Sequence, residues 1–130
     1  MSKAHLYCLA IAAMGSSSGA RAQIDLTRLN GARFVEEYRN AGQVLARFTF
    51  DIRGTQGRWS SWSVGQPTER MTCTMQGRTC DLCCGQPGTL SAEPGARTTI
   101  EVLADGRNAV WRFRPAGGRQ GQDITLVRTR

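Results

Sequence analysis

Apolar and polar residues alternate along most of the chain after residue 40. In 44–52 every second residue from Val44 to Ile52 is apolar, and most of the residues between them are polar. Successive side chains of a β-strand point to opposite faces, so this pattern predicts a strand with one buried and one solvated face. The same alternation in 68–76 and 109–114 predicts two more strands of this kind.

Glycine-containing turns separate the alternating segments. Gly54 and Gly57 bracket one turn, and Asp105-Gly106 supplies the positive φ that a tight hairpin needs. Together these signals predict strands over 44–52, 58–64, 68–76, 98–103, 109–114 and 123–129. About six short strands with little helix predict an all-β fold, either a small antiparallel β-sandwich or a barrel.

Two segments do not fit this pattern. Between residues 23 and 40 the apolar residues have a partly helical spacing that Gly31 interrupts, which predicts a short N-terminal helix over 32–39. The segment 81–97 has no strand pattern and contains two Pro-Gly turns. A connection of this length in a small domain is usually functional or tied down, and the cysteines at its start favour a disulfide-stapled loop.

Residues 1–22 have the layout of a cleaved secretory signal peptide. Lys3 makes the start positive, the apolar run 6–14 follows, and an Ala-Arg-Ala site ends at Ala22. The apolar run is too short to span a bilayer, which needs roughly 20 residues. We therefore expect a periplasmic or secreted protein with one β-rich domain over 23–130.

Removal of the signal peptide would take away the only lysine and the only histidine, Lys3 and His5. Mechanisms that need an imidazole or an ε-amine are then excluded, among them Ser-His-Asp and Cys-His catalysis and Schiff-base formation. The adjacent carboxylates Glu36 and Glu37 would diverge on a helix rather than converge on one substrate atom. We therefore expect no enzyme activity, no metal and no cofactor.

Positive charge is concentrated near the C-terminus. The chain has 17 basic residues, two of them in the signal segment, so 15 remain against 10 acids and the mature charge is +5. Residues 107–130 hold six arginines and one acid. Such asymmetry favours an anionic partner, although dispersed arginines also suit a plain solvated face. Arg112, Arg114 and Arg128 are the candidate binding residues.

Two tryptophans supply a second candidate binding feature. Trp59 and Trp62 are three positions apart, so a strand directs them to opposite faces. One is then expected in the core and the other at the surface. An exposed tryptophan flanked by serines stacks on a sugar ring or anchors a protein interface.

Four cysteines follow the signal segment, and an even number in an exported chain favours disulfides. They are Cys73, Cys80, Cys83 and Cys84. A bond between Cys83 and Cys84 would be strained, which disfavours Cys73–Cys80 pairing and leaves the two other connectivities open. Cys80 and Cys83 also form a CxxC pair, whereas the overall spacing does not match a zinc site.

These observations predict a non-catalytic exported module with a binding, inhibitory or accessory role. Its expected partner is a protein or an anionic component of the cell envelope. Export and the lack of a nucleic-acid-binding motif exclude nucleic acid. The alternative is a periplasmic thiol–disulfide protein that uses Cys80 and Cys83.

Overall fold

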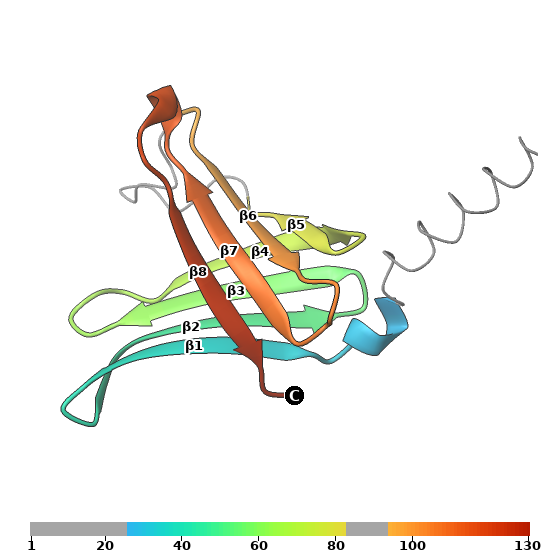
Figure 1. Cartoon of the computed structure of the whole chain (residues 1–130), viewed down its shortest axis with the longest axis horizontal. Coiled ribbons are helices and arrows are strands. Elements are labelled where there is room, and N and C mark those ends of the chain that lie inside the picture. Colours follow the sequence, from blue (N-terminus) through green and yellow to red (C-terminus); the bar gives the residue numbers. More distant parts are fainter. Residues whose placement is uncertain (1–25, 83–93) are drawn as a thin grey trace, which may run out of the picture.

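The computed structural model describes residues 26–82 and 94–130, most of which lie in β-strands (Figure 1). A 3-10 helix, η1 (Leu26–Leu29), precedes the strands, and another, η3 (Ala116–Gly118), lies between the last two. The strands are β1 (Arg33–Asn40), β2 (Gln43–Arg53), β3 (Gln56–Ser63), β4 (Glu69–Gln76), β5 (Thr79–Asp81), β6 (Arg97–Val102), β7 (Asn108–Arg114) and β8 (Gln122–Arg128). Neither described helix is long or apolar enough to cross a membrane.

The eight strands form a closed antiparallel barrel in which each strand pairs with its neighbours in the sequence. The barrel closes because β1 also pairs with β8, where Phe34 lies opposite Arg128 and Val35 lies opposite Val127. The expected all-β antiparallel fold is therefore confirmed. Six strands, β2–β4 and β6–β8, correspond to the six predicted strands, and β1 and β5 are additional.

The helix expected over 32–39 is wrong, because strand β1 occupies this segment. Phe34 is fully buried whereas Arg33 is partly exposed, which is the alternation of a strand. The apparent helical spacing joined residues of two different elements. Leu29 is buried at the end of η1, and Gly31 with a φ of +82° then turns the chain into β1.

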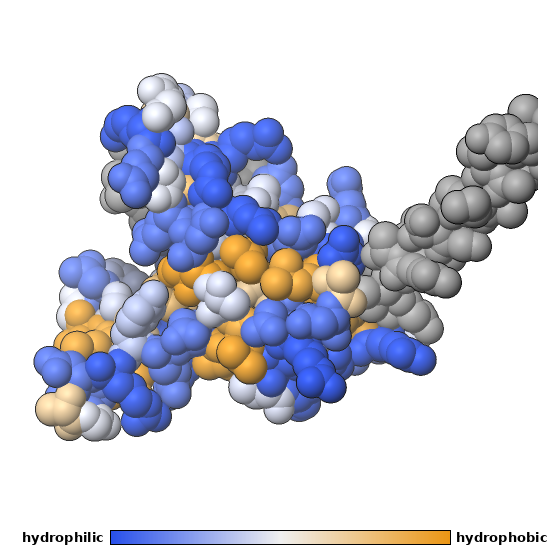
Figure 2. All heavy atoms as spheres, viewed as in Figure 1, coloured by the Kyte–Doolittle hydropathy of each residue, from blue (hydrophilic) through white to orange (hydrophobic). Residues whose placement is uncertain are grey.

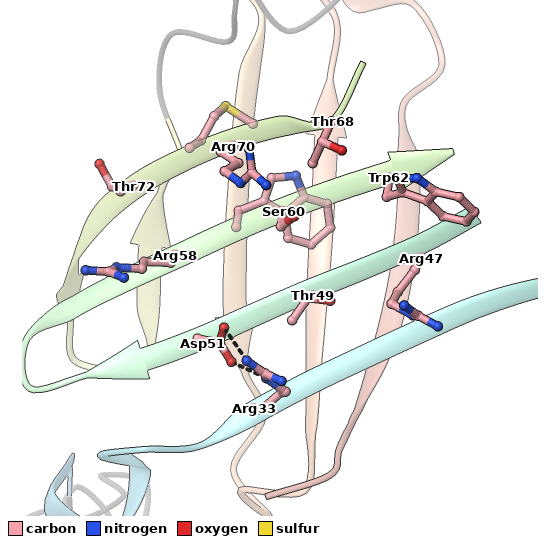
Figure 3. A pocket seen from close by; sticks show the side chains of 12 residues that line it. Arg33, Arg47, Thr49, Asp51, Arg58, Ser60, Trp62, Thr68, Arg70 and Thr72 are labelled. Atoms are coloured by element: carbon pink, nitrogen blue, oxygen red, sulfur yellow. Dashed lines mark hydrogen bonds and ion pairs between the residues drawn. The ribbon is translucent and has the colours of Figure 1, made fainter. Parts of the chain in front are cut away.

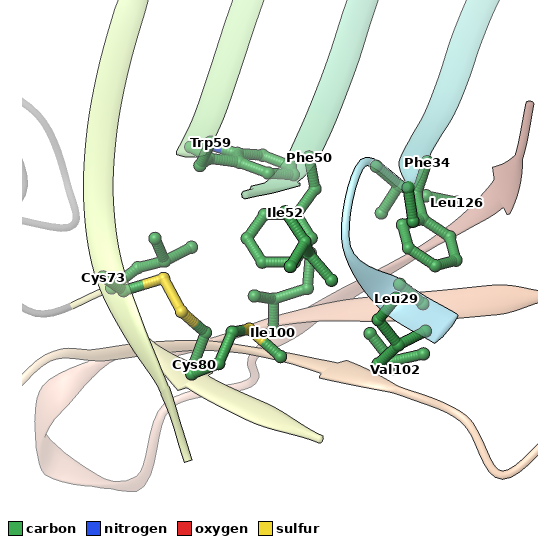
Figure 4. Close-up of a cluster of buried hydrophobic side chains, with 14 of the residues drawn as sticks. Leu29, Phe34, Phe50, Ile52, Trp59, Cys73, Cys80, Ile100, Val102 and Leu126 are labelled. Carbon is green, nitrogen blue, oxygen red and sulfur yellow. A yellow bond between two sulfur atoms is a disulfide. The ribbon is translucent and has the colours of Figure 1, made fainter. Parts of the chain in front are cut away.

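Inward-facing side chains from all parts of the barrel form one apolar core. Figure 4 shows the residues of η1, β1 and β2 packing against those of β6 and β8. The largest of the fully buried side chains are Leu29, Phe34, Phe50, Ile52, Cys80, Leu82, Thr98, Ile100, Val102 and Leu126. Burial of one aliphatic or aromatic side chain contributes roughly 1.5–3 kcal/mol, so this core is the main source of stability.

Five aromatic rings form a continuous series across the barrel, which we call the aromatic ladder. Its members in order are Tyr38, Phe48, Trp59, Trp111 and Phe113. At its centre the Trp59 and Trp111 rings are stacked, with centroids 5.5 Å apart and an interplanar angle of 7°. The ladder joins β1–β3 to β7, and each aromatic pair adds roughly 0.5–1.5 kcal/mol beyond the area it buries.

A disulfide joins Cys73 to Cys80, with a Cα–Cα distance of 5.7 Å. The two connectivities that the sequence favoured are therefore wrong in their pairing of Cys73. The reason is the β4–β5 hairpin, in which Gly77 at a φ of +63° reverses the chain and places Cys80 opposite Met75. Cys83 lies outside the described residues, as does Cys84.

Gly57 of β3 lies tightly against the Phe50 ring of β2 and against the disulfide. A Cβ atom at this position would lie 2.7 Å from Cζ of Phe50 and 2.8 Å from Sγ of Cys80. Real Cβ contacts are longer, and both neighbours are buried. Only a glycine leaves room for the Phe50 ring and the disulfide together.

We expect Gly57→Ala to destabilise the barrel by about 1–3 kcal/mol, because the added methyl group overpacks a filled core. Arg58→Ala is the control, since the neighbouring Arg58 side chain is exposed on the outer face. Urea unfolding followed by tryptophan fluorescence measures both. Equal midpoints for the two variants would contradict the close packing described for Gly57.

The disulfide can be located by digestion under non-reducing conditions. Trypsin cleaves after Arg78, and a protease that cleaves before aspartate cuts before Asp81, so Cys80 is released in the dipeptide 79–80. We expect mass spectrometry to find 71–78 linked to this dipeptide. A link from 71–78 to 81–97 would instead show that Cys73 pairs with Cys83 or Cys84.

Candidate functional site

A hollow of about 700 Å³ lies on the outer face of β1–β4 (Figure 3). We call it the outer hollow. Its lining residues are Arg33, Arg47, Thr49, Asp51, Arg58, Trp59, Ser60, Trp62, Thr68, Arg70, Met71 and Thr72. Most of them are the outward-facing members of strands whose inward-facing members build the core.

Side-chain size explains why this outer face is hollowed. In the strand register Thr49 lies opposite Ser60, and Ser60 lies opposite Arg70. The two small hydroxyl side chains form the middle of the face, while arginines and Trp62 stand around them (Figure 3). Small residues in the central row thus produce a floor with long side chains at its rim.

The outer hollow is strongly positive. It is lined by four arginines and one carboxylate, so its formal charge is 4 − 1 = +3. Asp51 accepts hydrogen bonds from Nε and Nη2 of Arg33 at 2.6 and 3.2 Å, and these bonds, with the charge attraction, raise the pKa of Arg33. Arg47 pairs at 2.7 Å with Glu37, which lies outside the hollow.

Arg58 and Arg70 differ from the other two arginines because neither forms an ion pair or a side-chain hydrogen bond with any described residue. Both are exposed at the surface. Each can therefore offer its complete set of guanidinium N–H donors to a ligand, at no cost of breaking an internal pair.

The two tryptophans lie on opposite faces of β3, as the sequence predicted. Trp59 is 2% exposed and belongs to the core, whereas Trp62 is 37% exposed and lines the outer hollow. Trp62 lies opposite Arg47 in the β2–β3 register. Of the two candidates, Trp62 is the one that a ligand can reach.

The three candidate arginines of the C-terminal third all have partners. Arg112 pairs with Glu101 at 2.9 Å, and Arg114 pairs with Asp123 at 2.7 Å. The hydrogen bond from Arg114 holds the pKa of Asp123 below its ordinary value. Both arginines lie on β7, which pairs with β6 and β8 rather than with β3.

The guanidinium of Arg128 likewise has partners within the protein. It donates hydrogen bonds to the carbonyl oxygens of Arg28, Gly106 and Arg130 at 2.9, 3.2 and 3.1 Å. The structure therefore brings none of the three C-terminal arginines to the outer hollow that contains Trp62. The concentration of positive charge in the last part of the sequence does not mark the hollow.

Arg58 and Arg70 were missed by the sequence analysis. They lie in the part of the chain where basic and acidic residues balance, so a running charge count gives no signal. A signal appears only when outward positions of paired strands are compared. That comparison requires the β3–β4 register, in which Arg58 lies opposite Thr72 and Ser60 opposite Arg70.

No family model matches the chain, and neither a curated protein nor a solved structure matches it. The described residues contain no group of three side chains able to hold a metal ion. What the outer hollow offers is hydrogen bonding to anions by guanidinium groups, hydrogen bonding to hydroxyls, and one flat aromatic surface.

The positive hollow and the exposure of Trp62 can be tested together by fluorescence quenching. Iodide should be concentrated near Trp62 by the surrounding arginines, while caesium should be repelled. We expect iodide to quench the wild-type protein much more strongly than caesium does, and Trp62→Phe to remove most of the iodide effect. Equal quenching by the two ions would contradict the positive character of the site.

Proposed function

We propose that this protein is an exported, non-catalytic binding module whose outer hollow binds an acidic glycan. The observation that carries the proposal is the presence of two unpaired arginines, Arg58 and Arg70, beside the exposed Trp62 on one face. An acidic glycan is a chain of sugar rings that bear carboxylate, sulfate or phosphate groups. Each of these chemical features has a matching group in the hollow.

The arginines suit the anionic groups of such a ligand. A guanidinium presents paired N–H donors that match a carboxylate, sulfate or phosphate in two-pronged geometry. Arg58 and Arg70 occupy diagonal positions on paired strands, which are typically about 7–8 Å apart. This arrangement favours a ligand with repeated negative charges over a single small anion.

The remaining lining residues suit the sugar part. Trp62 offers an aromatic face on which the apolar face of a sugar ring can stack. Hydroxyl side chains can exchange hydrogen bonds with sugar hydroxyls, and four of them line the hollow: Thr49, Ser60, Thr68 and Thr72. A polyanion without sugar rings would leave this half of the site unused.

Export remains part of the proposal and rests on residues 1–22, which lie outside the described part of the chain. The Cys73–Cys80 disulfide is compatible with an oxidising compartment. A thiol–disulfide function receives no support, because Cys80 is bonded to Cys73 and only 1% exposed. An acidic glycan of the cell envelope or its surroundings is therefore the partner that we propose.

Binding to two acidic polymers tests the proposal. Polygalacturonate carries carboxylates on sugar rings, and polyglutamate carries them without sugars. We expect Arg58→Ala/Arg70→Ala to weaken binding of both polymers by at least about tenfold, since each lost charge-assisted hydrogen bond costs about 1.5–3 kcal/mol. Trp62→Ala should weaken polygalacturonate binding only. Isothermal titration calorimetry at low salt measures both polymers.

Arg112→Ala/Arg114→Ala is the matched control, because it removes the same charge from arginines that already have carboxylate partners. It should leave affinity within about twofold of the wild type. Equal weakening by the two double variants would show that net charge, not the outer hollow, determines binding. Unchanged polygalacturonate affinity in Trp62→Ala would reject the glycan.

A further inference from the structure

We propose a second binding site, independent of the outer hollow, that accepts an extended peptide as an added β-strand. The site is the space between residues 36–40 of β1 and residues 122–126 of β8, which we call the wedge. Figure 1 shows β1 and β8 meeting near the C-terminus and diverging toward their other ends. On this face the surface is notched between the two diverging arms, and apolar atoms gather at the base of the notch (Figure 2).

The wedge exists because the pairing that closes the barrel is short. The β1–β8 register contains only Phe34 and Val35 of β1. Beyond them, 36–40 pair only with β2, and 122–126 pair only with β7. Each strand therefore has one edge without a partner strand in the described part of the chain. Unpaired edges of this kind are templates for strand addition.

The direction of the backbone groups on these edges follows from the backbone hydrogen bonds where β1 and β8 meet. The N–H of Arg128 donates to Arg107 on the β7 side, whereas the N–H of Thr129 donates to Arg33 on the β1 side. Backbone groups alternate in direction along a strand, so those of Thr125 and Asp123 face the wedge. By the same alternation from Arg33, those of Glu37 on β1 face it as well.

The side chains at the base of the wedge favour an apolar strand. The aromatic ladder runs from Tyr38 on β1 to Phe113, which lies opposite Gln122 of β8. Tyr38 is 49% exposed, so the outer end of the ladder is open to solvent. Alternate side chains of an added strand would lie against these rings and bury apolar surface.

The negative charge of Glu36 favours a peptide that also carries a basic residue. Glu36 lies on the same face of β1 as Phe34 and Tyr38, so its side chain points toward the interior side of the wedge. It forms no ion pair with any described residue. A basic side chain on the incoming peptide would neutralise it. The occupant is therefore an extended peptide whose inward-facing residues are apolar except for one basic residue beside Glu36.

A synthetic octapeptide that alternates valine with threonine, with one inner valine replaced by lysine, is the probe. We expect it to bind the purified protein and to change tryptophan fluorescence through the ladder, and we expect the same peptide with glutamate in place of the lysine to bind at least tenfold more weakly. Glu36→Gln should reduce this preference. Failure of the lysine-containing peptide to bind would overturn the proposal, whatever the outcome for acidic polymers.

Two changes to the backbone test strand addition itself. Thr125→Pro removes the backbone N–H of residue 125, which faces the wedge, and leaves the hydrogen bonds between β7 and β8 intact. We expect it to weaken peptide binding at least tenfold, while Thr125→Val, which keeps the N–H, has little effect. A probe peptide N-methylated at every second residue should lose affinity for the wild-type protein.

Other occupants of the wedge give different results. If N-methylation does not reduce affinity, or if Thr125→Pro and Thr125→Val bind equally, the peptide is held by its side chains alone and strand addition is wrong. Sedimentation equilibrium addresses a second copy of the chain. A dimer that dissociates in Thr125→Pro would mean that another barrel, and not a separate peptide, fills the wedge.

Discussion

Closure of the barrel depends on a short seam between its first and last strands. Phe34 and Val35 pair with β8, and Arg33 adds backbone hydrogen bonds to Thr129 and Arg130. All other pairings among the described strands join neighbours in the sequence, so this is the one strand pairing that brings the first and last strands together. Closure curves the sheet, so that the core and the aromatic ladder lie inside the barrel and the outer hollow lies on its outer face. Because the seam is short, the two arms can diverge and leave the wedge.

The part of the fold that was predictable from the sequence is the part in which one face is wholly apolar. Strands β2, β4 and β7 show the clearest alternation, since most of their inward residues are apolar and meet the core. Strand β1 was hidden because Glu36 and Glu37 interrupt its alternation and Leu29 of η1 precedes it at helical spacing. The strand forms because β2 and β8 supply its hydrogen-bond partners, and local propensity does not carry that information.

The site was less predictable than the fold, because a binding face on a sheet is assembled across strands. Trp59 and Trp62 are three positions apart on one strand, so the prediction that one is buried and the other exposed was correct. The positions of Arg58 and Arg70 beside it follow from register, which is set by turn lengths and core packing. The disulfide was not predictable for a similar reason, since the β4–β5 hairpin, and not the spacing of the cysteines in the sequence, brings Cys73 to Cys80.

One arginine gives the seam a property that the surface ion pairs lack. The guanidinium of Arg128 is bonded to the carbonyl oxygens of Arg28, Gly106 and Arg130, which ties η1, the β6–β7 turn and the C-terminus together. Carbonyl oxygens have no proton to gain as the medium becomes acidic, unlike the carboxylate of Asp123. A guanidinium also keeps its charge throughout that range. Acid strong enough to protonate Asp123, whose pKa its pair with Arg114 lowers, therefore removes that pair, while the bonds from Arg128 persist.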